Sequence, residues 1–286
     1  MRAVDIHLRE SRLFPGEKLE GMVSIRTDRP FECNRVILKV RGKEHTEHGS
    51  GDTRVTDDKV IIGKVFRINE GRMFPEGATM IPFAIPLPKN LPPSYQGYYG
   101  HIEYSAEAVV EVTWAIDPKC KKLFKVLQNR PPFLEDKNQL EPSTIKQDEL
   151  QVQLEENIFR LETGLRVRFK VEQRNNVRGV RFEIVKREVA NCGRRTLERE
   201  RPLERKFHEV HWDDFDRWLE IEIGNNWRYH LPFVSNLFKV TYHLKVTLDV
   251  GWNFDPSIKC PLKFSDSAPK RDLLDEIAID LGFDEW

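Results

Sequence analysis

Two histidines and three aspartates near residue 210 are of the types that bind metal ions. His208 and His211 stand three positions apart, and Asp213, Asp214 and Asp216 follow them. Imidazole nitrogens and carboxylate oxygens are common ligands of zinc and other divalent metals. On a strand or an irregular loop, however, side chains at i and i+3 need not converge, and no cysteine joins them. We expect a solvated charged loop here rather than a metal site.

A second pair of histidines, His45 and His48, repeats this spacing within residues 42–59. The segment is polar, contains glycine and has no hydrophobic period, which is typical of a long exposed loop. The same argument about convergence applies to it. The sequence therefore predicts neither a metal nor a cofactor.

Residues 92–95 spell Pro-Pro-x-Tyr, the motif that WW domains bind. Such a ligand must be an extended and accessible polyproline helix. Here the motif leads directly into a long strand with an apolar face, so we favour a structural role over recruitment of a WW domain.

Basic side chains alternate along one predicted strand of the second half, at Arg166, Arg168 and Lys170. Other basic residues lie nearby in the sequence, at positions 174, 178, 181, 186 and 187. A cationic face of this kind could bind an acidic peptide or anionic lipid, at about 1 kcal/mol per residue for a lipid surface. The alternative is that these charges serve solubility and protect a sheet edge.

Other reactive patterns are missing from the sequence. It contains no nucleophile elbow, no glycine-rich phosphate loop and no paired-carboxylate motif, so we expect a protein that is not an enzyme. Lys plus Arg and Asp plus Glu each number 46, which gives zero net charge and no global field for nucleic acid. The four cysteines are far apart, and neither an apolar signal segment nor a run of about 18 apolar residues is present. A soluble cytoplasmic protein with reduced thiols is expected.

A long amphipathic strand over residues 102–114 organises the first half. Its apolar positions alternate with polar ones, which predicts one buried face. The same strand recurs near the end of the chain, where Tyr104 and Trp114 correspond to Tyr242 and Trp252 (242 − 104 = 138). Beyond the following Asp-Pro turn we align Cys120 with Cys260, an offset of 140, and attribute the difference to a two-residue slip in the loop.

Shorter strands with turns between them fill both halves and predict antiparallel sandwiches rather than a parallel sheet. We expect strands at residues 4–8, 19–25, 36–40, 60–68, 152–154, 165–171, 180–184 and 219–223, and tight glycine turns at residues 14–17 and 162–164. Residues 67–77 are expected to be a turn region, and residues 192–216 a charged connection. A repeat of this length is about one domain long. The predicted organisation is a sandwich at residues 1–130, a linker at 131–148, a second sandwich at 149–266 and a tail at 267–286.

The tail is the only segment with a clear helical period. Leu273, Leu274, Ile277 and Leu281 lie on one helical face, and acidic residues occupy the rest. The leucine face could dock on the protein's own body or in a groove of a partner. The alternative is a disordered acidic terminus.

Several motifs, taken together, resemble the arrestin family in the broad sense. They are the Phe-Pro-Gly-Glu turn at residues 14–17 with the strand after it, the alternating strand at 36–44, the Pro-Phe-x-Ile-x-Leu-Pro run at 82–88, the Pro-Ser-Tyr-x-Gly run at 93–97, and Ile102-x-Tyr104. The resemblance spans about residues 2–266. Because no helix precedes Pro82 and no paired lysines lie on the first strand, the chain looks closer to alpha-arrestins, the arrestin-fold subunit of retromer or the prokaryotic sporulation-control relatives.

The resemblance implies an all-β protein of two tandem immunoglobulin-like antiparallel β-sandwiches. It implies a non-catalytic adaptor or scaffold that links membrane-protein cargo or receptors to cytoplasmic trafficking or signalling machinery. It also gives residues 43–58 the place of a receptor-probing loop, so that Lys43, His45, His48 and Arg54 become partner-binding candidates. The alternative functions are a retromer-like coat subunit or a sporulation-control-like regulator. Expected partners are proteins such as the cytoplasmic tails of membrane proteins, with possible peripheral contact with anionic membrane and no nucleic acid, for a monomeric protein.

Overall fold

The computed structural model is an all-β protein, as the sequence predicts. It describes residues 2–112, 116–132, 143–147, 149–154, 158–173, 176–224, 231–251 and 255–266. Within these ranges the only helical turns are two short 3-10 turns, η1 (Gly51–Thr53) and η2 (Trp212–Asp214). No helix among the described residues has the length and apolarity to cross a membrane.

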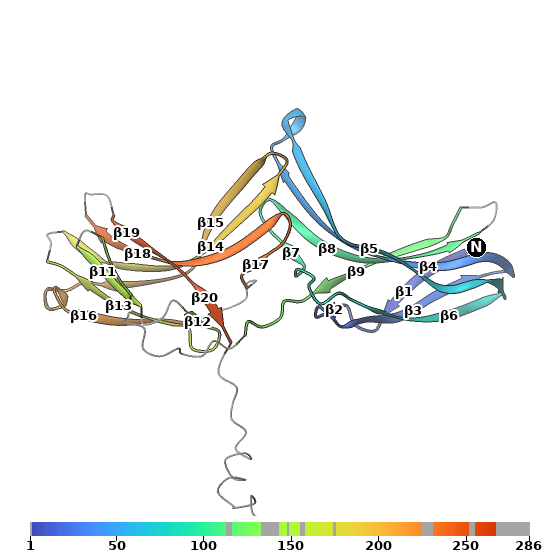
Figure 1. The fold of residues 1–286 in the computed structure, drawn as a ribbon, viewed down its shortest axis with the longest axis horizontal. Coiled ribbons are helices and arrows are strands. Elements are labelled where there is room, and N and C mark those ends of the chain that lie inside the picture. Colours follow the sequence, from blue (N-terminus) through green and yellow to red (C-terminus); the bar gives the residue numbers. More distant parts are fainter. Residues whose placement is uncertain are drawn as a thin grey trace, which may run out of the picture. The chain divides into compact units, whose positions relative to one another are not determined.

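The chain divides into two compact units, each with strands in antiparallel sheets (Figure 1). The first unit contains Met1–Asn129 together with two segments from the second half, Arg187–Glu200 and His230–Thr241. The second unit contains Arg130–Lys186, Arg201–Tyr229 and Tyr242–Trp286. The two inserted segments matter below, because they supply the partners of the candidate site.

The smaller sheet of the first unit has three antiparallel strands. Their order is β1 (Arg2–Leu8), β3 (Lys18–Thr27) and β6 (Gly77–Pro86). Alternate residues of β3 and β6 are buried, as the period-2 pattern requires. The turn before β3 has Gly16 at φ 90°, a left-handed conformation that favours glycine.

The larger sheet of the first unit is built around β8, the long strand predicted from its alternation. Ile102, Tyr104, Ala106, Ala108 and Val110 are all buried on one face. The sheet order is β2–β9–β8–β4–β5, with β7 also paired to β8. The bounds are β2 (Arg12–Leu13), β4 (Phe31–His48), β5 (Val55–Phe74), β7 (Tyr95–Gln96), β8 (Gly100–Glu111) and β9 (Lys119–Val126).

The prediction that residues 42–59 form an exposed loop is wrong. Strand β4 continues to His48 and β5 begins at Val55, and the two pair along their whole length as one hairpin with its tip at the far end (Figure 1). Residues 67–77 are likewise mostly strand, because β5 runs to Phe74. Burial does alternate along the distal part of β4, but the buried positions there are Gly42, Glu44 and Thr46, none of which is hydrophobic. A hydrophobic period cannot be detected where the buried residues are not hydrophobic.

The second unit has a sheet of four antiparallel strands in the order β10–β11–β13–β16, and a short parallel pair, β12–β20. A further sheet has the order β15–β14–β18–β17, with β19 also paired to β18, and parts of its strands belong to the segments assigned to the first unit. The bounds are β10 (Ser143–Gln147), β11 (Leu150–Leu154), β12 (Ile158–Arg160), β13 (Leu165–Val171), β14 (Val177–Cys192), β15 (Arg195–Glu209), β16 (Trp218–Ile223), β17 (Phe233–Val234), β18 (Phe238–Val250), β19 (Ser257–Pro261) and β20 (Lys263–Ser265).

The prediction that residues 192–216 form a charged connection without regular structure is also wrong. Strand β14 runs to Cys192, Gly193 turns the chain at φ 61°, and β15 returns as far as Glu209. Strand β15 is the edge of its sheet and is largely exposed on both faces. Its sequence therefore shows no apolar alternation. A segment rich in Arg and Glu without such alternation predicts a loop, although here it is an exposed edge strand.

The Asp-Pro turns confirm the repeat in atomic detail. The backbone N–H of Val112 donates to Asp117 Oδ1 at 3.0 Å, and that of Val250 donates to Asp255 Oδ1 at 3.1 Å. After each aspartate the proline carbonyl accepts from the long strand at 2.9 Å. Both turns therefore close in the same way, 138 residues apart.

The two-residue slip after these turns does not occur. Cys120 lies opposite Ala108 on β8. The residue of β18 that is equivalent to Ala108 is Val246, and Ile258 lies opposite it. The offset thus remains 138, since 258 − 120 = 138. Cys260 lies opposite Leu244, two pairs further along. The matching cysteines are a coincidence of sequence, because the strand register and not residue identity sets equivalence.

Candidate functional site

The distal part of the β4–β5 hairpin, residues 43–58, carries four of the predicted partner-binding residues; we call it the hairpin tip. It is ordered by backbone pairing, from Lys43 opposite Val60 to His48 opposite Val55. Gly49 lies at φ 87°, and a Cβ there would come within 2.6 Å of the Thr53 carbonyl oxygen. Glycine is therefore required for the chain to reverse at this point.

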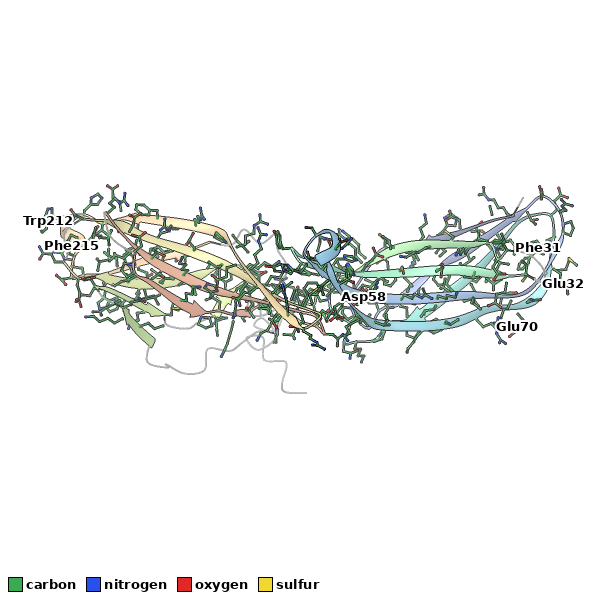
Figure 2. The ribbon with its side chains drawn as sticks, turned by 90° about the horizontal axis from the view of Figure 1, so that it is seen from above. Phe31, Glu32, Asp58, Glu70, Trp212 and Phe215 are labelled. Atoms are coloured by element: carbon green, nitrogen blue, oxygen red, sulfur yellow. The ribbon has the colours of Figure 1, made fainter. Side chains whose placement is uncertain are left out.

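Charged side chains form a network on the outer face of the hairpin tip. Lys43 Nζ lies 2.9 Å from Asp58 Oδ1, and His45 Nδ1 lies 2.7 Å from the same oxygen. His45 Nε2 is 3.6 Å from Glu47 Oε2, and Arg54 forms an ion pair with Glu47. Hydrogen bonds from Lys43 and His45 hold the pKa of Asp58 below its usual value, and Arg54 does the same for the pKa of Glu47. Figure 2 labels Asp58 on this hairpin.

The inner face of the hairpin tip contains a fully buried carboxylate, Glu44. Its Oε1 accepts from Asn236 N at 3.1 Å and from Asn236 Nδ2 at 3.0 Å. Its Oε2 accepts from Leu237 N at 2.6 Å and from Ser235 Oγ at 3.0 Å. A buried charge is costly unless it is hydrogen-bonded, and here each oxygen has two donors. These donors, all from the turn between β17 and β18, hold the base of the hairpin tip in place.

A second buried carboxylate, Glu188 of β14, is held in a similar way. Its Oε2 accepts from the Tyr95 hydroxyl at 2.5 Å. Its Oε1 accepts from Tyr98 N at 2.9 Å and Tyr99 N at 3.2 Å. Gly97 makes room for it, because a Cβ there would lie 2.6 Å from Glu188 Oε1. Glu188 thereby fixes the turn between β7 and β8.

Reasoning from sequence missed both carboxylates. Glu44 lies in a segment whose polar composition predicts an exposed loop, and a lone glutamate in a strand, such as Glu188, is usually solvated. The available signal was the repeat itself. Each glutamate lies four residues after the last apolar residue of its strand's alternating run, Val40 in one and Ile184 in the other.

The basic row on β13 contains one arginine, Arg166, that is paired with carboxylates. Arg166 lies 3.0 Å from Glu220 and 3.1 Å from Glu222 on β16. Arg168 donates to Gln153 Oε1 at 3.1 Å and lies over the ring of Trp218. Lys170, the third member, stands opposite Trp218 in the sheet register. This arrangement fits the alternative of surface charges that pair across strands better than a free cationic face.

Three further features of the sequence are the histidine-aspartate cluster near residue 210, the leucine face of the tail and the tryptophans that end the long strands. His208 Nε2 lies 3.7 Å from Asp214 Oδ2, but no group of three or more metal-ligand side chains gathers anywhere in the described ranges. The tail residues Leu273, Leu274, Ile277 and Leu281 lie outside the described residues. So do Trp114 and Trp252, the aromatic ends of the two long strands.

The first unit is similar to a known protein domain. Residues 3–130 match the family described as arrestin (or S-antigen), N-terminal domain. Residues 3–130 therefore form an arrestin-like domain. The matched range includes the hairpin tip with Glu44, and the Tyr95–Tyr99 turn that binds Glu188.

Curated proteins that are similar to part of this chain are named arrestin domain-containing proteins. This chain is 27% identical over 135 residues to arrestin domain-containing protein 17 of Caenorhabditis elegans. The aligned region covers 41% of this chain and 32% of that protein. It is 25% identical over 129 residues to arrestin domain-containing protein 1 of Homo sapiens, covering 43% of this chain and 30% of the relative. The matches therefore span about a third of the length of these relatives.

The Pro-Pro-x-Tyr motif is part of the folded core. Tyr95 is 3% exposed and its hydroxyl is bonded to Glu188. The carbonyl of Pro92 accepts from the Tyr104 hydroxyl at 2.7 Å, and Ser94 exchanges hydrogen bonds with Val126. A WW domain needs this segment extended and accessible, so the structural reading of the motif is the better supported one.

Proposed function

We propose that this protein is a non-catalytic adaptor that binds protein partners through the hairpin tip. The proposal depends on one observation: the hairpin tip presents Lys43, His45 and Arg54 in a single charged network on a backbone held by β-pairing and by Glu44. The similarity of residues 3–130 to the arrestin N-terminal domain supports the adaptor class, since arrestin proteins are generally adaptors without catalysis.

The chemistry of the network favours a charged, extended partner segment. Asp58 and Glu47 are each shared between two basic side chains, so the basic groups are oriented before a partner arrives. Oriented groups lose less side-chain entropy on binding than free ones. The expected ligand is an acidic segment, such as a cytoplasmic tail of a membrane protein, which would take over the contacts that Asp58 and Glu47 now make.

Localisation follows from the same proposal. We place the protein in the cytoplasm, peripheral to membranes where its partners reside. The four cysteines, all described, form no disulfide with one another, which fits a reducing compartment.

Affinity capture with charge-reversed variants tests the proposal. Lys43→Glu combined with Arg54→Glu reverses two charges of the network and leaves Glu44 and the strand pairing untouched. We expect captured partners to fall about tenfold or more, since each lost charge-assisted contact contributes about 1.5–3 kcal/mol. The matched control is Arg166→Glu, which reverses an equally exposed arginine on β13.

Three results would decide between functions. Loss with the tip variant and retention with the control support the adaptor. Equal capture by wild type and tip variant would refute the assignment of the hairpin tip. A constitutive one-to-one complex that both variants retain would instead favour a structural coat subunit.

A further inference from the structure

The two buried carboxylates occupy equivalent positions of the sequence repeat. The apolar face of β4 at Val36, Leu38 and Val40 corresponds to that of β14 at Val180, Phe182 and Ile184, an offset of 144 (180 − 36 = 144). The same offset relates Glu44 to Glu188. It also relates the turn glycines Gly49 and Gly193, both with positive φ.

The turns that bind the carboxylates are equivalent as well. The offset of 138 that relates the long strands maps Tyr98 and Tyr99 onto Asn236 and Leu237. In both turns these two backbone N–H groups are the donors to the carboxylate. Each repeat therefore offers one glutamate and one turn, and each glutamate is bound by the turn of the other repeat. We call the two contacts the Glu44 latch and the Glu188 latch.

The reciprocity identifies a local two-fold relation within the first unit. In a contact of this symmetry residue i of one copy meets j of the other, and j meets i. A residue on the axis meets its own equivalent, and here Tyr95 meets Phe233, with ring centroids 5.0 Å apart (233 − 95 = 138). The side-chain donors differ: Tyr95 supplies a hydroxyl to Glu188, whereas Ser235 and Asn236 supply side-chain donors to Glu44.

We propose that the two latches form one cooperative switch that opens and closes as a unit. Tyr95 links them directly, because its hydroxyl binds Glu188 while its ring packs on Phe233 and Phe238, which flank the turn of the Glu44 latch. Thr46, two residues after Glu44, adds a bond from its buried hydroxyl to the Asn191 carbonyl at 2.7 Å. Opening either latch removes packing and hydrogen bonds from the other.

The switch sets the order of the hairpin tip. Glu44 lies at the base of the tip, so release of its carboxylate frees the tip from the turn at residues 235–237. Through the coupling, a change at Glu188 in the second half of the chain mobilises the tip in the first. This inference goes beyond the proposed function and does not depend on it, because its test involves no partner.

Hydrogen exchange of the full chain tests the coupling with Glu44→Gln and Glu188→Gln. In each variant an amide NH2 replaces an oxygen that accepts hydrogen bonds and so faces other donors. We expect exchange of the released turn, residues 232–240 for Glu44→Gln and 95–101 for Glu188→Gln, to speed up about tenfold or more. The remote turn should also speed up, about threefold or more, in both variants, because coupling between two sites acts in both directions.

Two further variants make the test decisive. Glu183→Gln is the control, since Glu183 lies on the same strand with similar burial but pairs with Arg205, and it should leave both turns unchanged. Tyr95→Phe keeps the ring contact and removes one donor, so it should speed both turns by a smaller factor and serves if a glutamine variant does not fold. Acceleration confined to the turn next to each substitution would overturn the switch and leave two independent latches.

Discussion

At the scale of single residues, burial decides the chemistry of groups whose types suggest reactivity. Cys260 lies in the second unit at 2% exposure, and burial raises the pKa of its thiol to about 11. Cys120 is only half-buried, and burial together with the nearby Asp5 raises its pKa too. A thiol reacts as its thiolate, so these cysteines are structural rather than nucleophilic.

The pKa of Cys260 gives a prediction about alkylation. At pH 8 a thiol with a pKa of about 11 is about 0.1% thiolate, whereas an ordinary thiol with a pKa near 8.5 is about a quarter thiolate. We expect mass spectrometry after iodoacetamide treatment at pH 8 to find Cys120 modified first and Cys260 protected until the protein is unfolded. Cys120→Ser should abolish the early modification. Labelling of Cys260 as fast as Cys120 in the native protein would contradict this.

At the scale of elements, the long strands and the tight turns follow from local rules. The Asp-Pro turns after β8 and β18 show this, because each aspartate accepts from the backbone N–H of a buried valine at the end of its strand. The hairpins β4–β5 and β14–β15 show the opposite. Their distal strands are polar, and only long-range pairing makes them strands.

The two aspartates should contribute equally to their respective units. Asp117→Ala and Asp255→Ala each remove the acceptor of one buried N–H, and we expect each to lower the free energy of unfolding by about 1–3 kcal/mol. Urea denaturation of the two variants measures this. Asp57→Ala, which changes an aspartate on β5 outside the turns, is the control. A large difference between the two losses would argue against the structural equivalence of the turns.

At the scale of the whole molecule, the units do not coincide with the sequence halves. Phe238 belongs by sequence to the second half, yet it is 1% exposed within the first unit and its ring lies 5.4 Å from that of Tyr95. The second unit has a buried aromatic of its own, Phe169, whose ring packs against the ring of Phe182. The stability of the first unit should therefore depend on residues beyond residue 130.

Truncation of these two aromatics tests that dependence. Phe238→Ala should cost about 3–5 kcal/mol by loss of burial and creation of a cavity, and should speed exchange of the β8 amides of the first unit. Phe169→Ala, the matched control, should instead speed exchange of the β16 amides. The division would be refuted if Phe238→Ala left β8 unaffected.

The sequence by itself determined the all-β class, the repeat, the turns at Gly16 and Gly164 and the buried face of β8, because these depend on local periodicity and on glycine's freedom at positive φ. It also pointed to Lys43, His45 and Arg54, by a motif resemblance. Only the tertiary structure decided that residues 42–59 are strands, that Arg166 is paired and that Glu44 and Glu188 are buried. The physical reason is that a polar side chain becomes buried only when distant donors converge on it, and those donors lie 89 to 193 residues away in the sequence.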